Sequence, residues 1–221
     1  MLSGGAGRAH AQLPIDPKLL IARRDSMVVR TKGVTVGWRT IQLEKVDGGF
    51  LAYDNLQILE SNLLRTEISL NERGRLRYVR QGGTLAGVPV RTSLTYSGNR
   101  VRGVAVVADT SGPRTVESDM VIPPGTVDDI SLSLFLPALP WAEGAVWHFP
   151  DYVADAAQLQ SLTLTVVGTA TITLRSGPVD AWQGILTGGA TQTVVYVSQA
   201  RPYRLLRIDF PEVDLEFLLV D

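Results

Sequence analysis

The chain has 221 residues, with 21 Lys and Arg against 22 Asp and Glu and a formal net charge of -1. The chain therefore has no net positive charge that would attract nucleic acid or an acidic membrane surface. The absence of cysteine excludes disulfides, thiolate nucleophiles and cysteine metal sites, and two histidines are too few for a histidine metal cluster. We expect no nucleic-acid partner, no cofactor and no metal. No window approaches the roughly 20 apolar residues that a membrane-spanning helix needs, so no transmembrane span is expected either.

The first residues, MLSGGAGRAHAQLP, contain a small-x-small pattern. Ala9-His10-Ala11 before Gln12 is the kind of site that signal peptidase prefers. The charged and apolar regions of a complete leader are both missing. Residues 1–12 are therefore either a disordered tail or the remnant of a signal peptide. The second interpretation favours export, to the periplasm or cell envelope of a bacterium.

Residues 13–221 are predicted to form a single β domain that begins with one short helical element. Asp16 is suited to an N-cap and Pro17 to the first helical position, which indicates a short N-terminal helix or turn. The next segments alternate apolar and polar residues with period 2, as strands do. Turn signals separate them at 47–49, 71–74, 82–83, 97–99 and 111–113, a spacing typical of an all-β sandwich or barrel.

The segment 123–152 interrupts this pattern with prolines around an apolar run. Thr126 or Asp128 could cap a helix over residues 130–139, which Pro137 and Pro140 would end early. We interpret the segment as a proline-rich cap or crossover and not as a core strand.

Strand-like segments return after Ala157 and predict an antiparallel meander to the C-terminus. Arg201, Arg204 and Arg207 lie three residues apart, which could indicate a basic helical face. Period 2 fits residues 205–210 better, so these arginines are expected on a turn and a solvent-facing strand. The predicted fold is an all-β, antiparallel, strongly curved sheet or barrel-like structure.

The C-terminal part of the chain resembles a known family. The motifs are VVGTATITLRSGPVDAWQGIL, VVYVS, RPYRLLRID and LEFLLV within residues 163–219, together with PGTVDDISLSLFLPALPWAEG in the middle of the chain. They are similar to the exported bacterial β-proteins catalogued as domain of unknown function 3108. The resemblance implies an exported, β-barrel-like or curved-sheet domain. It implies no activity, and it has no functional residues to transfer.

Two polar groups are candidates for chemistry. Asp128-Asp129 could bind a hard cation or share a proton, but an Asp before an apolar run is more often a helix cap. His148 with Asp151 could serve a hydrolase that uses Ser131 or Ser133 as nucleophile. No G-x-S-x-G elbow accompanies them. A lone histidine beside aromatic residues is more often structural, so no catalytic residue is assigned.

Large aromatic side chains concentrate in the proline-rich segment. They could line the mouth of an apolar cavity, or they could plug the end of the barrel. The candidate ligand-binding residues are Phe135, Trp141, Trp147, Phe149 and Tyr152.

These patterns favour a non-enzymatic envelope protein that binds or carries an apolar or lipid-like small molecule inside the curved sheet. One alternative is a structural or interaction protein of the envelope. A second is a hydrolase that uses His148 and Asp151.

Overall fold

The computed structural model describes residues 12–220, and within them fifteen strands form one sheet that is antiparallel except at one end. The prediction of an all-β fold is confirmed. The sheet does not close, because β8 is the last strand at one end and β9 is the last strand at the other.

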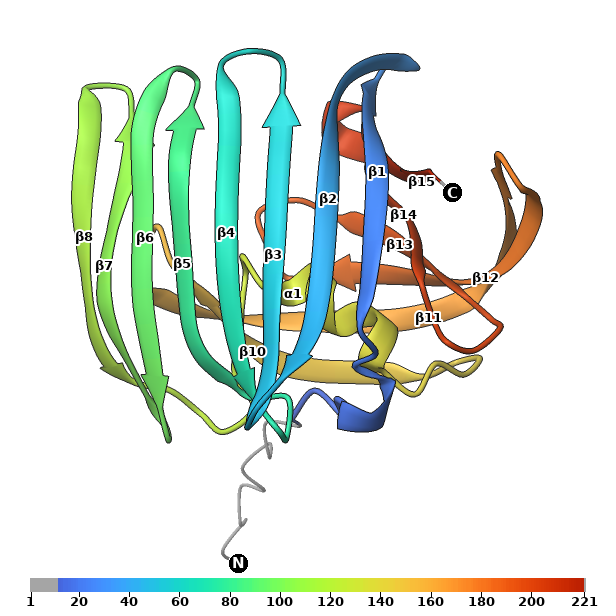
Figure 1. The fold of residues 1–221 in the computed structure, drawn as a ribbon, viewed down its shortest axis with the longest axis horizontal. Coiled ribbons are helices and arrows are strands. Elements are labelled where there is room, and N and C mark those ends of the chain that lie inside the picture. Colours follow the sequence, from blue (N-terminus) through green and yellow to red (C-terminus); the bar gives the residue numbers. More distant parts are fainter. Residues whose placement is uncertain (1–11, 221) are drawn as a thin grey trace, which may run out of the picture.

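The first half of the sheet is a series of long hairpins, in which each strand pairs with the next one along the chain (Figure 1). A short 3-10 helix, η1 (Pro17–Leu19), precedes them, with the Asp16 side chain accepting a hydrogen bond from the Lys18 backbone N–H. The strands are β1 (Arg23–Thr31), β2 (Val34–Val46), β3 (Gly49–Ile58), β4 (Asn62–Asn71), β5 (Leu76–Leu85), β6 (Val88–Ser97), β7 (Arg100–Asp109) and β8 (Gly112–Val121).

The second half begins with a crossover that carries the chain from β8 to the opposite end of the sheet. The elements of the second half are, in order, β9 (Val127–Asp128), α1 (Leu132–Phe135), η2 (Leu136–Ala138), β10 (Val146–Val153), β11 (Gln158–Leu174), β12 (Gly177–Thr187), β13 (Thr193–Ser198), β14 (Leu205–Phe210), η3 (Pro211–Val213) and β15 (Leu215–Val220). The last strand, β15, pairs with β1 and so joins the two halves of the sheet.

The two halves of the sheet cross, and the core lies between them. In Figure 1, β10 and β11 pass behind the lower parts of the N-terminal strands at a steep angle. The helical segment α1–η2 belongs to this core, with Leu134, Phe135 and Leu136 each at most 2% exposed. On the facing strands, Ile68 and Val79 are equally buried. Removal of this apolar surface from water is the main force that holds the halves together.

Glycine permits the close approach of neighbouring strands in the first half. Gly83 on β5 has φ +153, and a Cβ there would lie 1.8 Å from the carbonyl oxygen of Leu63 on β4. No side chain fits such a position, so the strands can pack together there only with glycine.

Three details of the sequence-based prediction need correction. Gly82-Gly83 is not a turn but lies inside β5, and the turn comes at Ala86-Gly87. The crossover does not extend to residue 152, because residues 146–153 pair with β11 as a core strand. The helix that was expected over residues 130–139 is divided into α1 and η2, and neither Thr126 nor Asp128 is its N-cap, which is Ser131.

The arginines of the C-terminal hairpin are also less free than expected. The loop between β13 and β14 is confirmed, and Arg201 lies on it. Arg204, however, pairs with the buried Asp25, and Arg207 pairs with Asp209 and Glu216. Acidic side chains therefore neutralise two of the three: Asp25, distant in sequence, pairs with Arg204, and Asp209 on β14 and Glu216 on β15 pair with Arg207.

The interpretation of residues 1–12 as a tail or signal-peptide remnant falls almost wholly outside the described residues. From Gln12 to Val220, no helix has the length and hydropathy that crossing a bilayer requires.

Candidate functional site

The five candidate aromatic residues lie in and beside the crossover, and most of them belong to the core. Trp141 is 4% exposed, and its indole Nε1 donates a 2.7 Å hydrogen bond to the carbonyl oxygen of Leu136. Trp147 on β10 is partly exposed and packs edge-on against Trp141, with ring centroids 5.8 Å apart. The remaining candidates, each at most 1% exposed, are Phe135, Phe149 and Tyr152.

His148 and Asp151 are not brought together. Three residues apart on β10, they lie on opposite faces of the strand. The exposed His148 has Nδ1 2.9 Å from Thr163 Oγ1, whereas Asp151 is fully buried and accepts a 2.8 Å hydrogen bond from Gln160 Nε2. A base and its orienting carboxylate must be in hydrogen-bond contact, so this pair does not form the predicted hydrolytic arrangement.

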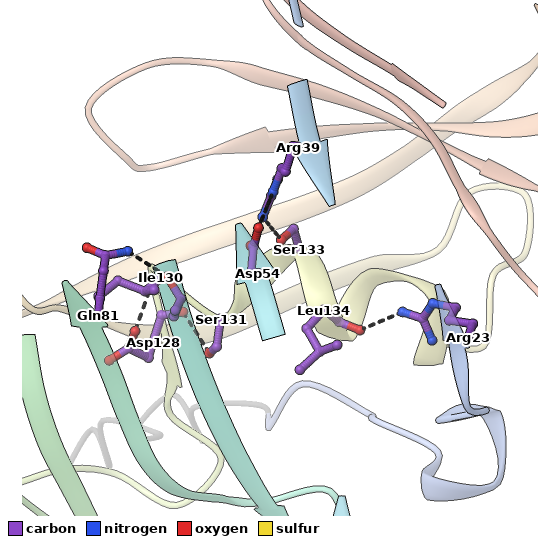
Figure 2. Close-up of polar contacts among 10 residues, drawn as sticks. Arg23, Arg39, Asp54, Gln81, Asp128, Ile130, Ser131, Ser133 and Leu134 are labelled. Atoms are coloured by element: carbon purple, nitrogen blue, oxygen red, sulfur yellow. Dashed lines mark hydrogen bonds and ion pairs between the residues drawn. The ribbon is translucent and has the colours of Figure 1, made fainter. Parts of the chain in front are cut away.

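The two candidate nucleophiles have structural partners. Ser131 is fully buried and donates a hydrogen bond to the backbone carbonyl oxygen of Asp128. Ser133 accepts a 2.5 Å hydrogen bond from Arg39 Nη2, and the same guanidinium binds both carboxylate oxygens of Asp54 (Figure 2). These contacts anchor α1 to β2 and β3.

A second arginine, Arg23 on β1, contacts the same helix. Arg23 donates to the carbonyl oxygen of Leu134 at 3.5 Å, as Figure 2 shows, and to Asp25 at 3.0 Å. Asp25 is 4% exposed and also accepts from Arg204 at 2.9 Å. A buried carboxylate between two guanidinium groups is well compensated, so this cluster has a structural explanation.

Three aspartates gather where the ends of the sheet approach each other. Asp128 is fully buried, accepts a hydrogen bond from the Tyr96 hydroxyl on β6, and accepts another from the Ile130 backbone N–H at 3.0 Å (Figure 2 shows the second contact). Asp129 accepts from the Ala154 backbone N–H at 3.3 Å. The second carboxylate oxygen of Asp151, Oδ1, has no hydrogen-bond partner among residues 12–220.

Loss of hydration raises the pKa of all three carboxyl groups. Loss of hydration, followed by repulsion from Asp129, raises the pKa of Asp128 well above its ordinary value. Loss of hydration raises the pKa of Asp151 to about 6. The same effect, with repulsion from Asp151, raises the pKa of Asp129 to about 7, although that residue keeps an exposed surface. In the part of the chain that the structure describes, no group of three or more His, Cys, Asp and Glu residues could hold a metal ion.

A small cleft opens on the inner face of the first half, next to Asp129. Its volume is about 160 Å³, and its lining is mainly aliphatic, with Leu64 from β4, Val90 from β6 and Ile130 from the crossover among its walls. These three side chains are partly exposed, whereas Ile68 and Leu94, further along β4 and β6 on the same face, are each 1% exposed. In Figure 1 the upper ends of β4 to β8 extend beyond β10 and β11, which explains the difference.

A larger groove lies on the opposite, outer face of the same strands. It has a volume of about 950 Å³ and crosses β3 to β6, with Tyr53, Arg65, Gly82 and Arg91 in its lining. Sequence reasoning missed both hollows. Alternation marked their residues only as strand, and Gly82-Gly83 was assigned to a turn.

Comparisons with known proteins support the fold. The model of the family described as "Protein of unknown function (DUF3108)" matches residues 6–212. The crystal structure of a β-barrel-like protein of domain of unknown function DUF1849 from Brucella abortus is similar, with a TM-score of 0.53 and 12% sequence identity, over 91% of this chain and 97% of that one. Comparison with curated proteins gives no match.

Proposed function

The chain belongs to the DUF3108 family, and from that premise we propose that it is a non-enzymatic protein that binds or carries an apolar or lipid-like small molecule inside its curved sheet. The observation that carries the proposal is the aliphatic cleft on the inner face of β4 to β6. Partly exposed aliphatic side chains at the edge of a core lose contact with water when an apolar ligand covers them.

The size of the cleft indicates which part of a ligand it holds. At about 160 Å³ it is smaller than a typical closed pocket of roughly 300–1,000 Å³. It therefore encloses one apolar end of a ligand and leaves the rest at the mouth. Asp129 and Asp155 lie there, and a polar head group of the ligand can contact their side chains. An amphipathic molecule fits this division.

The crossover has a part in the same proposal. Ile130 and two residues that follow β10, Ala154 and Asp155, line one part of the cleft, so the proline-rich segment acts as its cap. Ligand contact by the five aromatic residues stays a prediction. Trp147 is the one of them that keeps a partly exposed surface, so Trp147→Ala is the direct test: if ligand binding is unchanged, Trp147 does not contact the ligand.

Residence in the bacterial envelope belongs to the proposal as well. Its support is the Ala9-His10-Ala11 pattern and the motifs shared with exported β-proteins. Expression of the full coding region with a C-terminal epitope, followed by fractionation of the cells, tests it.

The first experiment is native mass spectrometry of the purified protein, followed by organic extraction and lipid analysis of what leaves with it. A stoichiometric apolar ligand is the expected result. Val90→Gln should reduce its occupancy, because it places an amide in the aliphatic wall. Val121→Gln makes the same change at a 63% exposed position outside the cleft and is the matched control. A ligand-free wild type that takes up no added lipid would contradict the proposal.

One observation favours a second candidate, an interaction protein of the envelope. Exposed apolar residues lie at or next to the turns β1–β2, β3–β4 and β5–β6, at the same end of the sheet, with Val34 64%, Leu59 59% and Leu85 44% exposed. A partner chain could cover this edge. The same mass spectrum distinguishes the candidates, because this alternative predicts a ligand-free protein that elutes with a partner.

A further inference from the structure

The outer groove contains a pair of arginines in register on either side of a glycine. Arg65 on β4 lies opposite Gly82 on β5, and Gly82 lies opposite Arg91 on β6. Residues in such a row project from the same face of a sheet, and neighbouring strands are roughly 4.8 Å apart. The two guanidinium groups therefore flank a position without a side chain, from backbones about 10 Å apart.

The space between the two arginines is open. A Cβ built on Gly82 would meet nothing within 4 Å, and Gly82 does not have a positive φ. The gap is consequently part of the groove of about 950 Å³ and not filled by a neighbouring side chain. That volume lies within the range of pockets that bind small molecules.

Neither arginine has a counter-ion within residues 12–220. Arg65 and Arg91 are exposed, and among residues 12–220 neither makes an ion pair or a side-chain hydrogen bond. The acidic residue in the lining of the groove, Glu67, already accepts a 2.7 Å hydrogen bond from Tyr78 and lies 3.8 Å from Arg80 Nη1. The lining thus holds three arginines and one engaged glutamate in a chain whose net charge is -1.

We propose that this groove is a binding site for a phosphate-bearing small molecule, with Arg65 and Arg91 binding the phosphate above Gly82. Each guanidinium presents a planar fork of donors, and a phosphomonoester has three terminal oxygens that can accept from two forks at once. A carboxylate, with two oxygens, satisfies only one fork fully. Tyr53, Asn55 and Ser93, which also line the groove, offer a ring face and polar groups to the organic part of the ligand.

This site goes beyond the proposed function and lies on the other face of the sheet. Along β4, Arg65 and Glu67 alternate with Thr66 and Ile68, which are 6% and 1% exposed and face the core. Failure of the inner-face proposal therefore leaves this one untouched, and the reverse also holds.

The test is isothermal titration calorimetry of the full chain with phenyl phosphate, at low and then at high sodium chloride. We expect binding that weakens with salt, since exposed charges are screened. Arg65→Ala and Arg91→Ala should each weaken it by about tenfold or more. Arg175→Ala removes an exposed arginine from the turn between β11 and β12, outside the groove, and should leave it unchanged.

Gly82→Val provides a test that leaves every charge in place. Its side chain fills the open gap without backbone strain, so binding should fall by a similar factor while the melting temperature is preserved. Vesicles of phosphatidylcholine with phosphatidic acid distinguish the source of the phosphate. Binding to them, with none to phenyl phosphate, would assign the site to a lipid head group. No binding of either probe, or equal binding by the Arg65, Arg91 and Arg175 variants, would overturn the proposal.

Discussion

The hydroxyl of Tyr152 on β10 donates a 2.5 Å hydrogen bond to Ser118 Oγ on β8, although the two strands lie near opposite ends of the sheet. Tyr96 and Asp128 make a second such contact between β6 and β9. Buried side chains, and not a ladder of backbone hydrogen bonds, therefore bring the ends of the open sheet together.

Loss of either partner in the Tyr152–Ser118 pair should destabilise the fold. Tyr152→Phe and Ser118→Ala each leave a buried polar atom without its partner, which lowers the free energy of unfolding by about 1–3 kcal/mol. The double variant should lose less than the sum of the two, because its remaining surface has no orphaned group. Urea denaturation of the four proteins measures this coupling, and strict additivity would show that the contact contributes nothing.

Asp25 should be more important for stability than an exposed aspartate with the same number of arginine partners. Asp25→Ala leaves Arg23 and Arg204 facing each other in a partly buried site, at a cost of about 3 kcal/mol. Asp119 also pairs with two arginines, Arg100 and Arg102, but on the surface, so Asp119→Ala should leave the denaturation midpoint unchanged. Equal midpoints for the two variants would contradict the structural role of Asp25.

Stability should decrease as the pH rises from about 5 to about 8. The pKa values of Asp151 and Asp129 are raised to about 6 and about 7 in the folded chain, so the folded state binds protons more tightly than the unfolded state. Their contribution is complete below the ordinary pKa near 3.8 and is lost as the pH passes through the raised values. Thermal melts at the two pH values measure this decrease.

Asp151→Asn should reduce that pH dependence, since it removes one of the groups whose pKa is raised in the folded chain. Asp119→Asn is its control, because its arginine partners lower the pKa of Asp119 to about 2, outside the pH range. A melting temperature that changes equally with pH in wild type and Asp151→Asn would show that Asp151 does not carry the effect.

The adjacent glycines of β5, Gly82 and Gly83, should differ in their tolerance of alanine. Gly83→Ala puts a methyl group against the carbonyl oxygen of Leu63 at a positive φ, which should destabilise the protein by more than about 1 kcal/mol. Gly82→Ala enters open space and should change stability by no more than about 0.5 kcal/mol. Similar losses in both variants would contradict the described backbone of β5.

Much of the fold was readable from local patterns. Period-2 alternation predicted an all-β chain, Asp16-Pro17 predicted the N-terminal helical turn, and the loop between β13 and β14 lay where predicted. These features depend on residues close in sequence, whose conformational preferences act within a few positions. The motifs of the C-terminal half also pointed to the correct family.

Local patterns misled where a neighbouring strand decided the conformation. Gly82-Gly83 has the composition of a turn, but Gly83 is required by the close approach of Leu63, about twenty residues earlier. Residues 146–153 have a proline and the aromatics of a cap, but their pairing with β11 makes them a strand.

The candidate sites depend on contacts that no local pattern contains. The pairing of Arg204 with Asp25 joins residues 179 positions apart, and the alignment of Arg65, Gly82 and Arg91 requires the register of three strands. Alternation of apolar and polar residues indicates which residues share a face of a strand. It does not indicate which strands are neighbours, or which strand ends extend beyond the opposing half of the sheet. Burial of apolar surface between the crossing halves sets those positions, and with them the inner cleft, the outer groove and the raised pKa values of Asp128, Asp129 and Asp151.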